Sequence, residues 1–136
     1  MTWLDPKEHA REELEHAREW LNSHPSLAKV FTARISQPHP FVWFGEVMES
    51  VAAGINAGDP LAIKLGCHYL IDDPKCPFGR ILKRRIANAL RRHHCEIPYE
   101  FRQALINAPH KFDSHPFTPH EYKDLLRLSN VLSKPA

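Results

Sequence analysis

The stretch from Gly79 to Cys95, GRILKRRIANALRRHHC, holds the side chains of this sequence that are best suited to binding phosphate. It contains six Arg or Lys and two His, and it has no carboxylate. Guanidinium and ammonium groups form charge-assisted hydrogen bonds with phosphate oxygens, and these bonds are stronger than neutral ones. The chemistry that these residue types support is the binding of a polyanion, without a covalent step.

The positive charge is segregated along the chain. The whole sequence has 18 Lys or Arg and 16 Asp or Glu, a formal net charge of +2. The segment from Pro74 to Cys95 carries seven of the basic residues and no acidic one, so the rest of the chain has 11 basic and 16 acidic residues, a net charge of −5. Separation of this kind is typical of a surface that attracts a polyanion.

Because the stretch from Gly79 to Cys95 has no Asp or Glu, its cations have no acidic partner within it at the i±3 or i±4 spacing. Like charges at these spacings destabilise a helix by about 0.2–0.5 kcal/mol per pair. This uncompensated repulsion favours an external anion such as a nucleic acid. Two alternatives remain open: an ordinary solvated helix face, and a surface that binds an acidic protein.

The ten His and three Cys raise the question of a metal centre, above all the HHC triplet that ends at Cys95, together with Cys67, Cys76 and His68. Structural zinc sites combine pairs such as C-x2-C with H-x3–5-H, and this sequence has no C-x2-C pair. We therefore expect buried thiols and surface imidazoles, with no metal and no cofactor.

No catalytic motif occurs in the sequence. It lacks G-x-S-x-G and H-E-x-x-H, and its five glycines include no phosphate-binding loop. His9, Glu13 and His16 share one face of the predicted first helix, but this face is highly charged, and solubility explains it. We do not expect an enzyme.

The length and composition predict one domain with a real core, because the chain has 136 residues and is 43% hydrophobic. No apolar run approaches the roughly 20 residues that a membrane span needs. The first residues, MTWLDPKEHAREELEH, are too charged for a signal peptide. An odd number of cysteines without a secretion signal argues against a disulfide framework. We expect a cytoplasmic monomer with reduced thiols.

Helix-start signals recur, each consisting of a capping residue followed by proline at the first helical position: Asp5-Pro6, Asp59-Pro60 and Thr118-Pro119. Apolar periodicity then predicts helices over residues 6–22, 25–35, 41–56, 60–72, 79–92, 99–107 and 119–133. The proline-rich segment 108–117 is not predicted to be helical, and a short β-hairpin is considered near residues 109–118. The fold class is a mainly α, compact single domain of six or seven short helices.

Three of these helices have distinct expected positions. Residues 60–72 are apolar almost all round, which places that helix at the centre of the fold. In residues 79–92, Leu82, Ile86, Ala89 and Leu90 form a core face opposite the cations. The first helix has only a thin apolar stripe, so we predict residues 1–23 to be an acidic N-terminal helical extension and residues 24–136 to be the main domain.

In order and spacing, several short motifs resemble the ProQ/FinO family of bacterial RNA chaperones. Pro60-Leu61-Ala62-Ile63 resembles the PL-x-I-G-I motif of the family, Ala89-Leu90-Arg91 its A-L-R motif, and Lys111-Phe112-Asp113 its R-x-D-L-D-G motif. Tyr99 falls eight residues after Arg91, where the family has a tyrosine in a short helix. Lys64 occupies the glycine position of the first motif. The resemblance covers about residues 59–132.

This resemblance implies binding of structured RNA, typically the base of a terminator-like stem-loop or small RNA with its 3′ single-stranded tail. It also implies promotion of RNA–RNA pairing in post-transcriptional regulation. Under this hypothesis, Tyr99 stacks on or hydrogen-bonds to a terminal nucleotide, and His110 and Lys111 hold a terminal phosphate. The predicted contacts to phosphates of the A-form stem come from Arg80, Lys83, Arg84, Arg85, Arg91 and Arg92.

Two competing hypotheses belong to other classes of protein. The first is a small all-helical adaptor that binds a protein through apolar grooves and its acidic first helix, without nucleic acid. The second is a metal-dependent regulator that uses Cys95 and neighbouring histidines.

Overall fold

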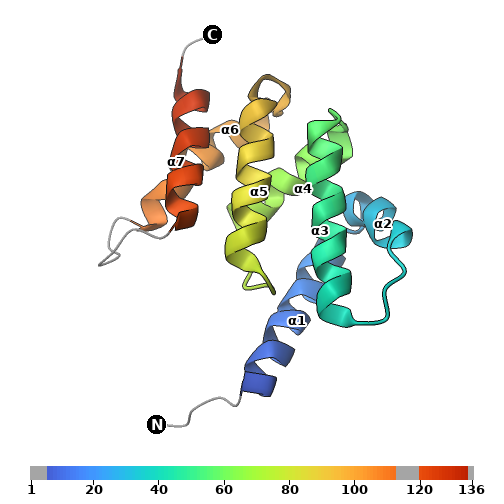
Figure 1. The fold of residues 1–136 in the computed structure, drawn as a ribbon. Helices are drawn as coiled ribbons and strands as arrows, with labels where there is room; N and C mark the ends of the chain where they lie inside the picture. The colour runs from blue at the N-terminus through green and yellow to red at the C-terminus, as the bar shows by residue number, and fades with distance from the viewer. Residues whose placement is uncertain (1–5, 113–119, 135–136) are drawn as a thin grey trace.

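The computed structural model describes residues 6–112 and 120–134, with side chains placed for residues 8–110 and 122–134. Within these residues the chain forms seven α-helices, two short 3-10 helices and no strand (Figure 1), which confirms the predicted mainly α fold. The α-helices are α1 (Pro6–Ser23), α2 (Pro25–Arg34), α3 (Pro40–Asn56), α4 (Pro60–Asp72), α5 (Gly79–Arg92), α6 (Tyr99–Asn107) and α7 (His120–Ser133). The 3-10 helices are η1 (His94–Glu96) and η2 (Ala108–Phe112).

The proline-rich segment after α6 differs from the sequence-based expectation. The considered β-hairpin does not form at residues 109–112, because the chain continues from α6 directly into η2. Pro109 lies in the first turn of η2, where its missing N–H costs no hydrogen bond. Residues 113–118 of the considered hairpin lie outside the described part of the chain.

The junction between α3 and α4 shows why these two helices end and begin where they do. Gly58 has a φ of 77°, and its N–H donates to Ile55 O at 2.9 Å, while Asp59 N donates to Gly54 O at 2.9 Å. This pair of bonds is a Schellman C-cap, which favours glycine at the left-handed position. Asp59 Oδ1 then accepts from Leu61 N at 3.0 Å, which confirms the predicted N-cap. The predicted caps at Asp5 and Thr118 lie outside the described residues.

The helices form two layers. Figure 1 shows α3, α5 and α7 side by side, and α2, α4 and α6 pack against their other face. The helix α4 lies at the centre, as predicted, because it contacts α2, α3, α5 and α6. Lys64 does not interrupt α4. No helix among the described residues has both the length and the apolar character needed to cross a membrane.

The C-terminal half of α1 is part of the hydrophobic core. Ala17, Trp20 and Leu21 are buried in the same cluster as the central residues of α3 and α4. Trp20 Nε1 also donates to Asp72 Oδ2 of α4 at 3.0 Å. Removal of α1 would therefore expose core surface, although its N-terminal half is more exposed.

Gly54 of α3 allows a close approach of α3 to α4. A Cβ at this position would lie 2.7 Å from Ala62 Cβ, which cannot rotate away. We expect Gly54→Ala to lower the free energy of unfolding by about 1–3 kcal/mol, despite a gain of up to about 1 kcal/mol in helix propensity. Urea denaturation measures this change.

Gly45→Ala in the same helix is the matched control, because its Cβ would meet only the Phe78 ring at an ordinary 3.6 Å. We expect this control to be neutral or stabilising. Equal stability of the two variants would contradict the packing of α3 on α4.

Candidate nucleic-acid interface

The helix α5 is held rigidly between α3 and α7, and this fixes the direction of its charged side. Its buried residues are Leu82, Ile86, Ala87, Ala89 and Leu90, which confirms the predicted core face. The cations therefore project from a packed helix, and the packing fixes the backbone positions that carry them before a ligand binds.

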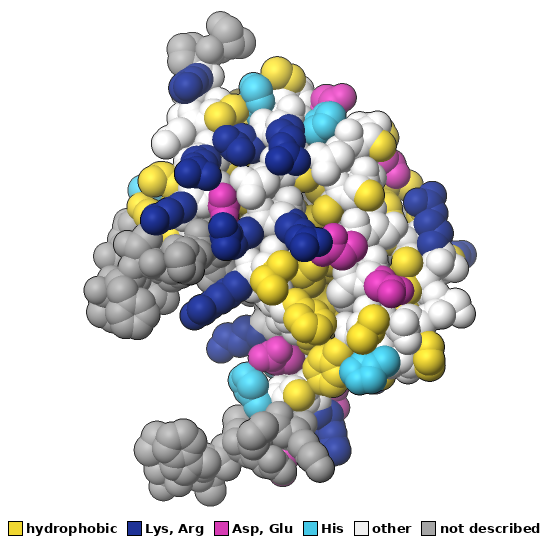
Figure 2. Space-filling model, viewed as in Figure 1, with side chains coloured by type: hydrophobic (Ala, Val, Ile, Leu, Met, Phe, Trp, Pro, Cys, Tyr) yellow, Lys and Arg dark blue, Asp and Glu magenta, His cyan; other side chains and the backbone are white. Residues whose placement is uncertain are grey.

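Lys and Arg side chains gather over α5 and α7 in the space-filling view (Figure 2). Lys123 and Arg127 of α7 are exposed and extend the charge of α5 onto the neighbouring helix. In the sequence, Lys123 and Arg127 have i, i+4 spacing on the side of the helix that lies opposite the buried Leu125 and Leu128. This spacing was the signal that could have identified them. We define the basic face as Arg80, Lys83, Arg84, Arg85, Arg91 and Arg92 of α5 with Lys123 and Arg127 of α7.

Three cations of α5 have acidic partners on other segments, which corrects the expectation of uncompensated charge. Lys83 Nζ lies 2.5 Å from Asp73 Oδ1, in the segment after α4, and Arg85 pairs with Glu49 of α3. Arg84 Nε donates to Asp124 Oδ2 of α7 at 2.8 Å. These partners are 10 to 40 positions away in the sequence, so helical spacing within the stretch did not reveal them.

Asp124 joins the two helices of the basic face. It is a buried carboxylate, and besides Arg84 it contacts Arg127 Nη1 at 3.6 Å. Two guanidinium groups thus share one carboxylate, which leaves positive charge in excess at the α5–α7 seam. Taken as a whole, the eight cations of the basic face have ion pairs with only three carboxylates among the described residues.

Arg80, Arg91 and Arg92 form no ion pair with a carboxylate in the described part of the chain. Arg80 and Arg92 are exposed, and Arg91 is half-buried with Nη2 bonded to Asn88 Oδ1 at 3.5 Å. Arg92 and Arg85 line a polar hollow of about 360 Å³ between α3 and α5. By contrast the Lys83 side chain is only 11% exposed and is paired with Asp73, so Lys83 is poorly placed to reach a ligand.

Tyr99 is the first residue of α6 and is 90% exposed. It follows the short η1 turn that begins after Arg92, so Tyr99 lies at the same end of the molecule as Arg91 and Arg92. Hydrogen bonds fix this turn, with Arg102 Nη2 donating to His94 O at 3.1 Å. An aromatic ring this exposed is available to stack on a ligand.

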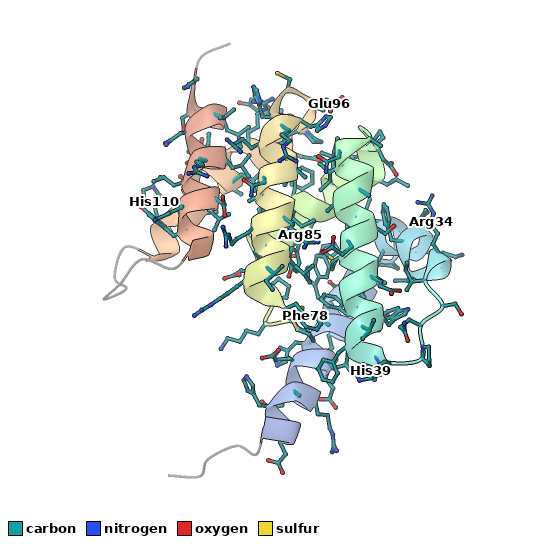
Figure 3. The ribbon with its side chains drawn as sticks, viewed as in Figure 1. Arg34, His39, Phe78, Arg85, Glu96 and His110 are labelled. Carbon is teal, nitrogen blue, oxygen red and sulfur yellow. The ribbon has the colours of Figure 1, made fainter. Side chains whose placement is uncertain are left out.

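The structure does not bring His110 close to this end of the molecule. Figure 3 places His110 beside α7, well away from Glu96 in the turn between α5 and α6. Nine residues of α6 separate the two regions, a rise of about 13 Å. Tyr99 and His110 therefore lie at opposite ends of α6. Lys111 follows in η2, and its side chain lies outside the described part.

An exposed apolar groove adjoins the basic face, at residues that the sequence did not single out. Phe78 and Ile81 are 50% and 56% exposed, and with Val42 of α3 they line a hollow of about 290 Å³. The sequence signal that could have revealed this groove is Ile81, because it is an apolar residue that lies outside the core face of α5. Phe78 has a φ of 60°, an uncommon value for a side-chain-bearing residue, at the start of α5.

The cysteines are free, and two of them are buried as expected. Burial raises the pKa of the Cys67 thiol, and that of Cys76, to about 12, so both are poor metal ligands or nucleophiles at neutral pH. Cys95 is exposed, and its Sγ lies 3.4 Å from His94 Nε2.

Comparison of the chain with protein-family models, curated proteins and solved structures finds no match. The functional assignment of the basic face therefore depends on its geometry and on the short motifs described above.

Proposed function

We propose that this chain binds structured RNA through the basic face, in the manner that its resemblance to the ProQ/FinO family implies. The observation that supports this proposal is the excess of exposed guanidinium groups on two adjacent, packed helices. A large part of the affinity of such a surface comes from phosphates and the release of their counterions.

The ion pairs of the basic face are compatible with this proposal. Both members of the Arg85–Glu49 pair are exposed, and exposed ion pairs are worth only about 0–1 kcal/mol. A phosphate can therefore replace Glu49 as the partner of Arg85 at small cost. Arg84 keeps its buried partner Asp124, and it can offer a phosphate only the N–H groups that Asp124 does not use. Arg80, Arg91 and Arg92 need no such exchange.

The expected ligand is a stem-loop with a 3′ tail. The deep, narrow major groove of A-form RNA prevents side chains from reading the bases, so the arginines contact phosphates and 2′-hydroxyls. A tail that leaves the stem near Arg91 and Arg92 reaches Tyr99, whose ring stacks on an unpaired base. Contacts of this kind hold RNA without chemistry and allow two RNAs to pair.

RNA binding by the basic face predicts a strong salt dependence. About four to six phosphate contacts give a slope of log K against log salt of roughly −3 to −5. Filter binding of a terminator hairpin between 50 and 200 mM salt, with intact and 3′-trimmed ends, measures the slope and the contribution of the tail. A slope near zero, or only micromolar affinity that trimming does not change, contradicts the proposal.

The apolar groove favours a second candidate function, that of a protein-binding adaptor. Exposed apolar surface lined by Val42, Phe78 and Ile81 is suited to an apolar side chain of a partner. An adaptor would purify free of nucleic acid, whereas an RNA-binding protein would carry it. The ratio of absorbance at 260 and 280 nm before nuclease treatment separates the two.

A further inference from the structure

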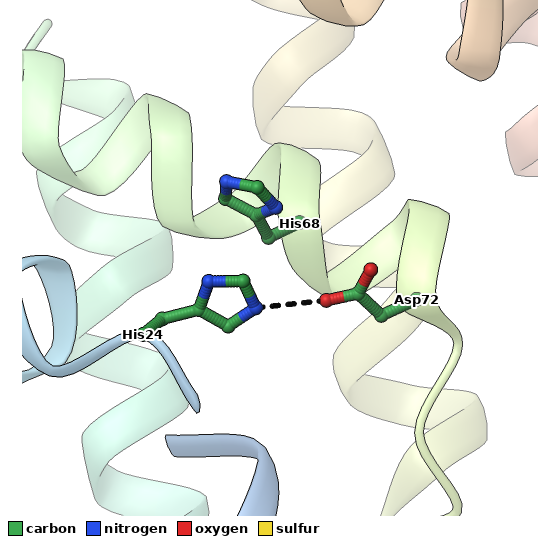
Figure 4. Close-up of side chains that lie close together, drawn as sticks. All are labelled: His24, His68 and Asp72. Atoms are coloured by element: carbon green, nitrogen blue, oxygen red, sulfur yellow. Dashed lines mark hydrogen bonds and ion pairs between the residues drawn. The ribbon is translucent and has the colours of Figure 1, made fainter. Parts of the chain in front are cut away.

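Three side chains that can ligate a metal meet on the part of the molecule formed by α4 and the start of α2. His24 is the residue before α2, and His68 and Asp72 are one turn apart on α4 (Figure 4). One ligand atom from each of the three lies within 4.8 Å of the other two. His24 Nε2 and Asp72 Oδ2 are 2.9 Å apart.

Neighbouring aromatic side chains hold these three residues in place. Trp20 Nε1 donates to Asp72 Oδ2 at 3.0 Å, and no hydrogen bond to Asp72 Oδ1 is found among the described residues. The His68 ring lies 4.2 Å from the His24 ring and 4.9 Å from Phe101, centroid to centroid. Metal ligands are commonly oriented by such outer contacts, which reduce the entropy cost of binding.

The local electrostatics suit a neutral imidazole at His68. Burial lowers the pKa of His68, and the nearby His24 lowers it further, while Asp72 and Glu100 act in the opposite direction. A neutral ring offers a lone pair to a metal ion. The site is open to solvent, because the side chains of His24 and Asp72 are 18% and 37% exposed.

We propose that His24, His68 and Asp72 bind a zinc ion, which would tie the α1–α2 junction to α4. Two imidazoles and one carboxylate are a common three-residue zinc set, with water in the fourth position. Mg²⁺ and Ca²⁺ prefer oxygen ligands and fit this set less well. Zinc replaces the hydrogen bond between His24 and Asp72, and any proton on His24 Nε2 leaves to solvent.

The distances between donor atoms are close to those that zinc requires. Tetrahedral bonds of about 2.0–2.2 Å place ligand atoms roughly 3.3–3.6 Å apart. The separations here begin at 2.9 Å and stay within 4.8 Å, so small side-chain rotations complete the site. The proposal does not depend on RNA binding, because none of the three residues belongs to the basic face.

The proposed site departs from the expectation of no metal, and its ligands differ from the residues considered for zinc in the sequence, which were the HHC triplet with Cys67, Cys76 and His68. His68 is grouped instead with His24, which comes 44 positions earlier in the chain. The i, i+4 spacing of His68 and Asp72 on one helix was the available signal. The third ligand could come only from the packing of the α1–α2 junction on α4.

The test uses the full chain, stripped of metal by a chelator. Calorimetric titration with Zn²⁺ is expected to give one equivalent, and Co²⁺ is expected to give the visible absorption of a tetrahedral site. Zinc at about 100 times its dissociation constant is expected to raise Tm by roughly 8–12 °C. Absence of binding at 100 μM Zn²⁺ overturns the proposal.

His68→Gln is the decisive variant. The contacts recorded for this side chain are with aromatic rings, so the fold should survive its replacement, and we expect zinc affinity to fall about 100-fold. His94→Gln is the matched control, because His94 and Cys95 are the alternative donor pair, and its affinity should be unchanged. Zinc binding that is lost in His94→Gln and kept in His68→Gln overturns the proposal.

Discussion

Replacement of Arg91 and Arg92 by glutamine is expected to weaken the binding of a tailed stem-loop RNA by about 10- to 100-fold. Each lost charge-assisted contact to a phosphate is worth roughly 1 kcal/mol or more. Neither residue has an acidic partner among the described residues, so the substitution leaves no carboxylate unpaired there. The salt slope should become shallower by about one for each contact. Filter binding at several salt concentrations measures both effects.

Arg11→Gln/Arg18→Gln is the control for total charge. Both residues are exposed on α1, on the side of that helix opposite His9, Glu13 and His16, which line a hollow with Arg80 and Lys83, and the change in net charge is the same. We expect less than about a threefold effect, because salt screens charges beyond roughly 8–10 Å. An equal loss of RNA affinity in both double variants would show that the affinity depends only on the net charge of the protein.

The half-buried position of Arg91 requires one further comparison. Its Nε is buried without a hydrogen-bond partner in the described structure, so its replacement could also change stability. Arg92→Gln alone alters an exposed side chain and should retain the wild-type Tm. If Arg92→Gln binds RNA like the wild type, the hollow between α3 and α5 is not part of the interface.

The helices themselves could be predicted from local patterns. Pro60, Asp59 and Gly58 specify where α3 ends and α4 begins through bonds that join residues at most five positions apart. The apolar period of residues 79–92 likewise identified the buried face of α5. Such features depend on neighbours in the sequence, and the structure reproduces them.

The partners of charged residues could not be predicted in this way. The pairs of Arg84 with Asp124 and of Arg85 with Glu49 span 40 and 36 positions, and both require the layer of α3, α5 and α7 to be assembled. The grouping of His24 with His68 has the same cause. The residue types indicated which side chains can form ion pairs or bind a metal. Only the tertiary packing determines which side chains come together as partners.

The exposed Tyr99 leads to the second large expected effect. Tyr99→Ala should weaken the binding of an RNA with its 3′ tail by about 5- to 150-fold, because stacking of one base is worth roughly 1–3 kcal/mol. A side chain that is 90% exposed contributes little to the core, so Tm should hardly change. Filter binding of the tailed hairpin measures the loss.

A tail-trimmed hairpin and Tyr99→Phe together identify the cause of this loss. If the ring stacks on a tail nucleotide, Tyr99→Ala and wild type bind the trimmed RNA equally, because the contact is already absent. Tyr99→Phe keeps the ring and should keep most of the affinity for the tailed RNA. A loss in Tyr99→Phe as large as in Tyr99→Ala would instead assign the contact to the hydroxyl group. If Tyr99→Ala loses the same affinity for tailed and for trimmed RNA, Tyr99 contacts the stem, and another part of the surface binds the tail.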